Sequence, residues 1–278
     1  MKNARNRMGH PFTAVAFALV LLAAACGAPV PTKTEMVEDN RLSRADQIMR
    51  VANATRRGGD LHSAMALFRR AHNMDRTSAA PLIALGETAY AAEAYQESAE
   101  AYRDAITLAP EDAAARLGYG KTLIALGLPR QAAAQFRRAL DVDAKNPQAS
   151  SGLGVALDLM GDHRGAQERY KAAIKMAPEV LSLRNNLAMS LALSGDYDAA
   201  IRHLAEIAGD PAATARTRQN LALVYGLAGE VGKAAEIGRL DLDEAEVRNN
   251  LAYYARLRAL SPAARSAAIL GRGGDTSE

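Results

Sequence analysis

The chain has 278 residues, of which 49% are hydrophobic, and it contains a single cysteine and no tryptophan. One cysteine excludes a disulfide within the chain and a structural zinc site built from several cysteines. The sequence pI is about 9.0, but the excess positive charge lies in residues 1–25, and the rest of the chain has equal numbers of basic and acidic residues. No basic stripe of the kind that binds nucleic acid remains, so no nucleic-acid partner is predicted.

Residues 1–25 resemble a secretory signal peptide. Lys2, Arg5 and Arg7 precede an apolar run at 12–22, which ends in small residues at 23–25. The run is too short for a relaxed membrane-spanning helix, which needs about 20 residues. We therefore expect this segment to direct export and to be removed.

Cys26 follows this segment directly. The sequence Leu-Ala-Ala-Ala-Cys-Gly at 22–27 resembles a bacterial lipobox, although Ala23 stands where lipoboxes prefer leucine. The resemblance implies that the Cys26 thiol is diacylated and anchors the chain without a spanning helix. Gly27, where inner-membrane lipoproteins carry aspartate, implies the periplasmic face of the outer membrane. The alternative is ordinary signal cleavage that leaves a free thiol.

Residues 26–42 are predicted to form a flexible tether, because Pro29 and Pro31 interrupt a polar stretch without apolar periodicity. Ser43 and Asp46 have the spacing of a capping box, which predicts that the first helix starts there.

The remaining sequence is organised by a motif that recurs every 34 residues. In the stretch 147–178 the motif reads Gly154, Gly161, Ala166, Tyr170 and Pro178. Small residues fall where two antiparallel helices approach closely, and a glycine marks the turn between them. Equivalent residues predict six units, at 45–78, 79–112, 113–146, 147–180, 181–214 and 215–248.

This period and residue order resemble the tetratricopeptide repeat (TPR). The resemblance implies an all-α fold, a TPR solenoid of about six helix-turn-helix repeats spanning residues 43–248. The turn glycines are expected to need positive φ; they are Gly127, Gly161, Gly195 and Gly229. The sixth unit departs from the pattern, because Gly238 stands in place of an aromatic residue and Asp241 in place of an alanine.

Two further helices are predicted after the repeats. An amphipathic pattern covers 243–259, and Ser261-Pro262 starts a short helix that ends by Gly271. We expect residues 249–270 to act as capping helices that seal the apolar end of the solenoid, and residues 271–278 to form a disordered tail.

The sequence contains no arrangement of residues typical of catalysis. The segment Gly118-Tyr119-Gly120-Lys121-Thr122 is similar to the end of a phosphate-binding loop, but the first glycine of that motif is replaced by alanine. The histidines share no metal-binding spacing and are predicted to lie at the surface, His163 among them. We therefore predict no enzyme activity, no metal site, no cofactor and no small-molecule substrate.

In TPR folds the first helix of each pair lines a concave groove. The resemblance places eight residues there: Leu117, Lys121, Ser151, Val155, Asn185, Met189, Gln219 and Leu223. This mixture of apolar and amide side chains suits a polypeptide ligand, so protein partners are predicted. The alternative for each residue is plain helix surface. Asn186 and Asn220 recur before Leu187 and Leu221, and a structural role is favoured over partner binding.

A closer resemblance lies in the C-terminal half. The stretches 152–163, 183–188, 218–223 and 249–254 look like the TPR lipoprotein of the tight-adherence (Flp) pilus assembly system, TadD. The resemblance implies an outer-membrane-anchored periplasmic assembly factor that supports a secretin or pilus through protein contacts. The alternatives are a TPR lipoprotein serving another envelope complex, such as outer-membrane protein insertion or another secretin pilot, and a chaperone-like peptide-binding module.

Overall fold

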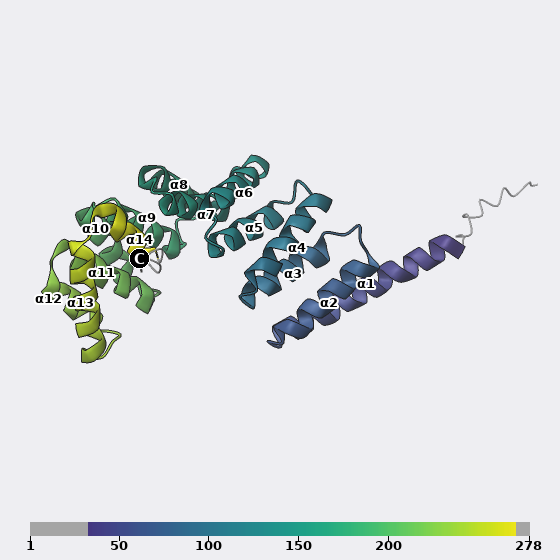
Figure 1. Cartoon of the computed structure of the whole chain (residues 1–278), viewed down its shortest axis with the longest axis horizontal. Helices are drawn as coiled ribbons and strands as arrows, with labels where there is room; N and C mark the ends of the chain where they lie inside the picture. The colour runs from purple at the N-terminus through teal and green to yellow at the C-terminus, as the bar shows by residue number, and fades with distance from the viewer. Residues whose placement is uncertain (1–32, 271–278) are drawn as a thin grey trace, which may run out of the picture. The chain divides into compact units, whose positions relative to one another are not determined.

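The computed structural model describes residues 33–270 (Figure 1). The signal peptide, Cys26 and the C-terminal tail lie outside these residues. The chain divides into two units, Met1–Asp39 and Asn40–Glu278; of the first, the structure describes residues 33–39, which are helical. None of the helices in the described range is both long and apolar enough to span a bilayer.

The described residues contain helices and no strands, which confirms the predicted all-α fold. The helices are α1 (Lys33–Arg57), α2 (Leu61–Met74), α3 (Ala80–Ala91), α4 (Tyr95–Leu108), α5 (Ala113–Ala125), α6 (Pro129–Val142), α7 (Pro147–Leu159), α8 (His163–Met176), α9 (Leu181–Leu193), α10 (Tyr197–Ala208), α11 (Ala215–Ala228), α12 (Val231–Gly238), α13 (Glu244–Ala259) and α14 (Pro262–Ile269). Helices α1 and α2 share a core and form the first hairpin. From α3 to α12 each odd-numbered helix packs against the next one to form the second to sixth hairpins, and successive hairpins stack.

The start of the first helix differs from the prediction. Helix α1 begins at Lys33, ten residues before Ser43, so Ser43 and Asp46 do not form its N-terminus and residues 33–42 are not a flexible tether. The sequence from 33 to 42 contains neither glycine nor proline and is rich in residues with high helix propensity. Read toward the N-terminus, the first residue that would stop a helix is Pro31, just before Lys33.

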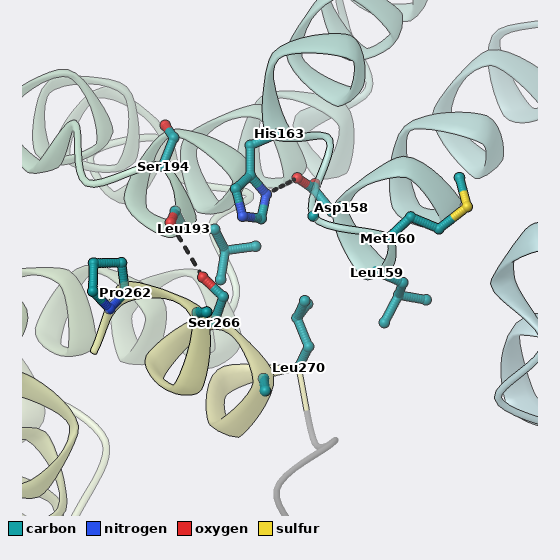
Figure 2. A pocket seen from close by; sticks show the side chains of 12 residues that line it. Asp158, Leu159, Met160, His163, Leu193, Ser194, Pro262, Ser266 and Leu270 are labelled. Atoms are coloured by element: carbon teal, nitrogen blue, oxygen red, sulfur yellow. Dashed lines mark hydrogen bonds and ion pairs between the residues drawn. The ribbon is translucent and has the colours of Figure 1, made fainter. Parts of the chain in front are cut away.

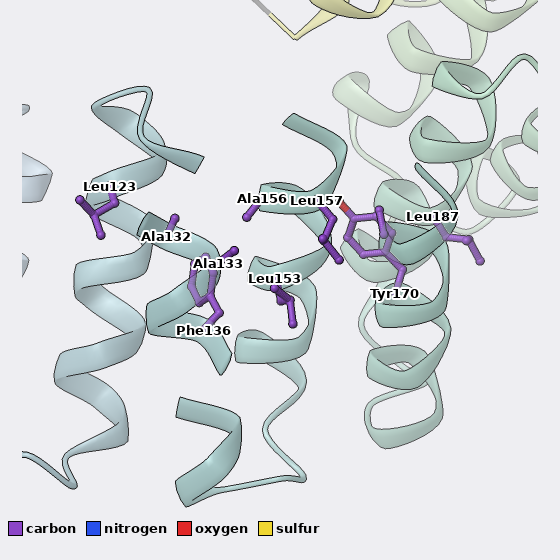
Figure 3. Close-up of a cluster of buried hydrophobic side chains, with 10 residues drawn as sticks. Leu123, Ala132, Ala133, Phe136, Leu153, Ala156, Leu157, Tyr170 and Leu187 are labelled. Atoms are coloured by element: carbon purple, nitrogen blue, oxygen red, sulfur yellow. The ribbon is translucent and has the colours of Figure 1, made fainter. Parts of the chain in front are cut away.

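An aromatic ring between two glycines holds neighbouring hairpins together. The Phe136 side chain of α6 is 1% exposed and belongs to a core that continues through Leu153 to Tyr170 (Figure 3). A Cβ atom added to Gly120 or Gly152 would lie 2.6 or 2.5 Å from the Phe136 ring. Phe136 therefore packs directly against the backbones of α5 and α7, which is why both helices carry glycine at these positions. Lys121 and its neighbours are in the helix α5 and not in a phosphate-binding loop.

The turn glycines adopt the predicted left-handed conformation. Their φ angles lie between +71° at Gly127 and +88° at Gly195 and Gly229. The second hairpin is the exception, because Glu93 occupies the equivalent turn position with a φ of +58°. A residue with a Cβ atom is strained in this conformation by about 1 kcal/mol.

Replacing Glu93 by glycine is therefore expected to raise the free energy of unfolding by about 0.5–1 kcal/mol, even though glycine gains more entropy on unfolding. The Glu93 side chain is exposed, so its removal sacrifices little packing. Urea unfolding followed by circular dichroism measures the change. The matched control is Gly161→Ala, at the same turn position of another hairpin, which should lower stability. A Glu93→Gly variant less stable than the parent would contradict the strain.

The sixth hairpin is short. Helix α12 has eight residues and ends at Gly238, where the repeat pattern lacks its aromatic residue. The other irregular residue, Asp241, accepts two hydrogen bonds from the Arg218 guanidinium, at 2.8 and 2.5 Å. This pair holds the turn after α12 against α11. Asp241 thus forms an ion pair where most other units pack an alanine.

Helix α13 begins at Glu244 with a capping box formed by Asp243 and Glu246. It starts five residues before position 249, where a seventh repeat would begin, because α12 is shorter than its equivalents. The predicted boundary at 248/249 therefore falls inside a helix. Helix α13 packs against α11 and α12, with Tyr254 beside Gly226, and so covers the end of the array. Helix α14 does not share this role, because it lies against α9.

Candidate functional site

The odd-numbered helices form one face of the repeat array. Helices α3, α5, α7, α9 and α11 contact one another across successive hairpins, whereas even-numbered helices mainly contact their neighbours in sequence. The eight predicted groove residues lie in pairs on α5, α7, α9 and α11. We call the surface formed by these four helices the inner face.

Four of the eight predicted residues line one cavity of about 250 Å³: Val155, Asn185, Met189 and Leu223. Lys121 and Ser151, together with Val155, line a neighbouring cavity of about 380 Å³. Leu117 packs against the core instead, and Gln219 is exposed and lines neither cavity. The structure therefore places six of the eight residues at two neighbouring cavities and leaves Leu117 and Gln219 outside both.

The recurring asparagines join successive repeats. The Asn186 side-chain amide donates to the Ser151 hydroxyl at 3.3 Å, and the Asn220 amide donates to the Asn185 side-chain oxygen at 3.0 Å. One bond joins α9 to α7 and the other joins α11 to α9, so each links two successive odd-numbered helices. This agrees with the favoured structural role. The bonds also fix the orientation of Ser151 and Asn185 on the inner face.

A buried carboxylate lies beneath this face. Asp158, at the C-terminal end of α7, is 5% exposed and accepts hydrogen bonds from three side chains (Figure 2 shows the one from His163). The His163 Nδ1 atom lies 2.8 Å from Oδ1, the Ser190 hydroxyl donates to Oδ1 at 2.8 Å, and the Tyr170 hydroxyl donates to Oδ2 at 3.0 Å. Burial raises the pKa of Asp158 above its ordinary value, and it raises the pKa of Tyr170 as well.

This cluster is a structural network rather than a nucleophilic site. Ser190 is fully buried, and its hydroxyl donates to Asp158 at 2.8 Å and to the His163 backbone carbonyl at 3.4 Å. Neither bond goes to the imidazole, so the imidazole is not placed to activate Ser190. The network ties the turn between α7 and α8 to α9. The prediction that His163 is a surface residue is wrong, because its side chain is 16% exposed and bonded to Asp158.

The repeat pattern contained a signal for this network. Positions equivalent to Asp158 carry Ile124 and Ala192 in the neighbouring units, so a charge at 158 is anomalous in an otherwise apolar position. A buried charge needs hydrogen-bonding partners, and these would have to come from adjacent helices.

Across the described range, no group of three or more His, Cys, Asp or Glu side chains is arranged to hold a metal ion.

The C-terminal helix lies on the inner face, which the sequence did not predict. The Ser266 hydroxyl donates to the Leu193 carbonyl at 3.2 Å, and Figure 2 shows α14 beside the ends of α7 and α9. On one side α14 borders a cavity of about 470 Å³ that includes Asp158 and His163. At its end, Ile269 and Leu270 line the 250 Å³ cavity of the predicted groove residues.

Comparisons with known proteins agree with this architecture. Models of the tetratricopeptide repeat match residues 89–155 and 160–216. No curated protein sequence gives a match. Solved structures with the same fold include a tetratricopeptide repeat protein from Parabacteroides merdae, at 16% identity and a TM-score of 0.62, covering 76% of this chain and 84% of that one.

Two further structures are similar in fold. The pilF protein of Pseudomonas aeruginosa is 19% identical with a TM-score of 0.57, covering 84% of this chain and 98% of that one. YrrB, described as a TPR protein with an unusual peptide-binding site, is 21% identical with a TM-score of 0.51, and the match covers 62% of this chain and 89% of that one. At these identities the likeness concerns the fold.

Proposed function

We propose that this tetratricopeptide-repeat protein is an outer-membrane-anchored scaffold that binds protein partners during assembly of a tight-adherence (Flp) pilus, without catalysis. The general part of this proposal, a TPR scaffold for protein interaction, follows from the repeat fold. The pilus assignment rests on the sequence resemblance to the pilus lipoprotein, and the likeness in fold to pilF of P. aeruginosa supports it.

The observation that carries the proposal is the composition of the inner face. Val155, Met189 and Leu223 supply aliphatic surface to the 250 Å³ cavity, and Asn185 and Asn220 supply amide groups. Aliphatic pockets bind side chains of a polypeptide, while nearby amides bond its polar groups. Equal numbers of basic and acidic residues after position 25 offer little electrostatic steering, so affinity must come from buried apolar contacts.

The proposed location rests on the predicted lipidation of Cys26. A diacylated cysteine would hold the repeats at the periplasmic face of the outer membrane, close to where a secretin is assembled.

The test is a crosslinking pull-down of the full chain from its native envelope, with a Cys26→Ser variant beside it. The proposal predicts capture of pilus or secretin components and their loss with Cys26→Ser. Capture of outer-membrane insertion machinery or another complex would contradict the pilus assignment and favour a different envelope partner. Unchanged membrane fractionation of Cys26→Ser would contradict the lipid anchor.

A substitution in the cavity tests the binding surface. Met189→Asp is expected to reduce partner capture at least tenfold, because a carboxylate in the aliphatic cavity cannot be desolvated without a partner. Met189 is only half-buried, so the fold should survive, as circular dichroism would show. Gln219→Asp is the matched control, since it adds the same charge on an inner-face helix outside both cavities. Equal capture by both variants would remove this cavity from the proposal.

A further inference from the structure

Helix α14 is attached to the inner face weakly. None of its residues is buried, in contrast to every helix from α2 to α13. Its polar contact with α9 is the single bond from Ser266 to the Leu193 carbonyl, at 3.2 Å. Arg265 also donates to the Tyr197 hydroxyl on α10. An element with few buried contacts opens at a much lower free energy than the array to which it is attached.

The start of α14 is joined to the end of α13 through Arg265. Arg265 donates to the carbonyls of Leu257, Arg258 and Leu260, at 3.0, 3.2 and 3.0 Å, and so joins the start of α14 to the end of α13. Between the two helices, Leu260 is extended, with φ and ψ of −79° and +154°. The far end of α14, at Ile269 and Leu270, lines the 250 Å³ cavity.

The packing around α14 is incomplete. Cavities of about 470 and 250 Å³ border the helix, and Leu270 lines both of them. Protein interiors and stable interfaces are filled at close to crystal density. The inner face is therefore larger than the helix that occupies it, and a better-fitting helix could bury more of the same surface.

We propose that α14 is an intramolecular occupant of the partner-binding groove, and that the partner is a short helix of similar chemistry that displaces it. This inference rests on the proposed function and adds the nature of the ligand. The bound face of α14 shows that chemistry, with small residues at Ala263, Ser266 and Ala267 and an aliphatic pair at Ile269 and Leu270.

The charge at the end of the groove adds a preference. Arg216 lines the cavity that receives Ile269 and Leu270, next to the C-terminal end of α14. A cation stabilises the negative end of a helix or a terminal carboxylate. The partner helix is thus expected to enter in the same direction as α14, with its C-terminal end at Arg216.

Being tethered gives α14 an advantage over a free competitor. A linked segment acts at an effective concentration of the order of millimolar, so even weak contacts keep the groove covered. A partner then binds with an apparent affinity reduced by the fraction of molecules in which α14 is released. Loosening α14 should increase partner binding without changing the groove.

The test uses methionine-methyl NMR on the purified full chain, with a peptide of residues 261–270 as the probe. Met160 and Met189 line the two cavities, and Met65, buried in the first hairpin, is the internal control. Ile269→Lys places a second cation near Arg216 and is expected to shift the Met160 and Met189 signals while Met65 stays unchanged. Added peptide should return both signals toward their original positions.

The peptide concentration at half-saturation is expected to be at least tenfold lower for Ile269→Lys than for the parent chain. Ala264→Lys, on an exposed position of α14 that lines neither cavity, should match the parent. Leu270→Lys serves as a second releasing variant. Unmoved Met189 signals in both releasing variants, or equal peptide affinity in all chains, would overturn the inference.

These outcomes separate the two proposals. If the peptide shows no preference for the released chain while envelope partners still crosslink to the inner face, α14 is not a competitor and the proposed function stands. If the peptide binds as expected but no envelope protein is captured, α14 covers the groove and the proposed function fails.

Discussion

Replacing Phe136 by alanine is expected to lower the free energy of unfolding by about 3–5 kcal/mol. The ring is 1% exposed and fills the space between Gly120 of its own hairpin and Gly152 of the next. Neither glycine has a side chain that could move into the cavity. Packing is therefore lost both between α5 and α6 and between α6 and α7. Urea unfolding followed by far-ultraviolet circular dichroism measures it.

The matched control is Leu240→Ala. Leu240 is 63% exposed, so its truncation should change stability by no more than about 0.5 kcal/mol. Because each repeat contacts only its neighbours, Phe136→Ala is also expected to uncouple the two halves of the array and broaden the transition. A loss below 1 kcal/mol for Phe136→Ala would show that the ring is not the main contact between these hairpins.

Replacing Asp158 by alanine is expected to cost about 2–4 kcal/mol. The substitution leaves the buried Tyr170 hydroxyl without its acceptor, and each unpaired group costs about 1–3 kcal/mol. It also removes the shorter bond of the Ser190 hydroxyl, which keeps the His163 carbonyl at 3.4 Å. Asp104, which is exposed, provides the control, since Asp104→Ala should be nearly neutral. A similar small loss for both variants would mean that the network contributes little.

Asp158→Asn separates the charge from the hydrogen bonds, because the asparagine amide can donate to the Tyr170 hydroxyl. Burial raises the pKa of Asp158 above 3.8, so the folded chain holds this proton more tightly than the unfolded chain. Its contribution to stability is fully present below pH 3.8 and is lost as the pH rises through the folded pKa. The parent should therefore lose stability relative to Asp158→Asn as the pH rises toward 7. A constant difference would contradict the raised pKa.

The sequence predicts the repeats well because the same contact recurs every 34 residues. Gly161 and Gly195 mark turns that require positive φ, and Gly120 and Gly152 mark places where a ring touches the backbone. Such positions tolerate few residue types, so their pattern is visible without an alignment. The all-α fold and the approximate bounds of five hairpins follow from it.

The candidate site is only partly predictable, because it depends on contacts between residues far apart in sequence. Ser266 bonds Leu193 across 73 positions, and no periodicity relates the two. The sequence therefore predicts that α14 helps to seal the end of the array, whereas in the structure α13 covers that end and α14 lies against α9. Val155, Met189 and Leu223 occupy equivalent positions of successive repeats and line one cavity. Gln219 is equivalent to Asn185 but is exposed and lines neither cavity.

The most direct test of a partner-binding inner face is photo-crosslinking in the native envelope, with a photoreactive amino acid at Met189 or at Val231. Met189 lines the 250 Å³ cavity, whereas Val231 lies 48% exposed on α12. If the inner face binds the partner, a specific protein is crosslinked from Met189, more of it when Ile269→Lys is added, and none of it from Val231. Capture of the same protein from Val231 but not from Met189 would place the partner on another surface and contradict binding at the inner face.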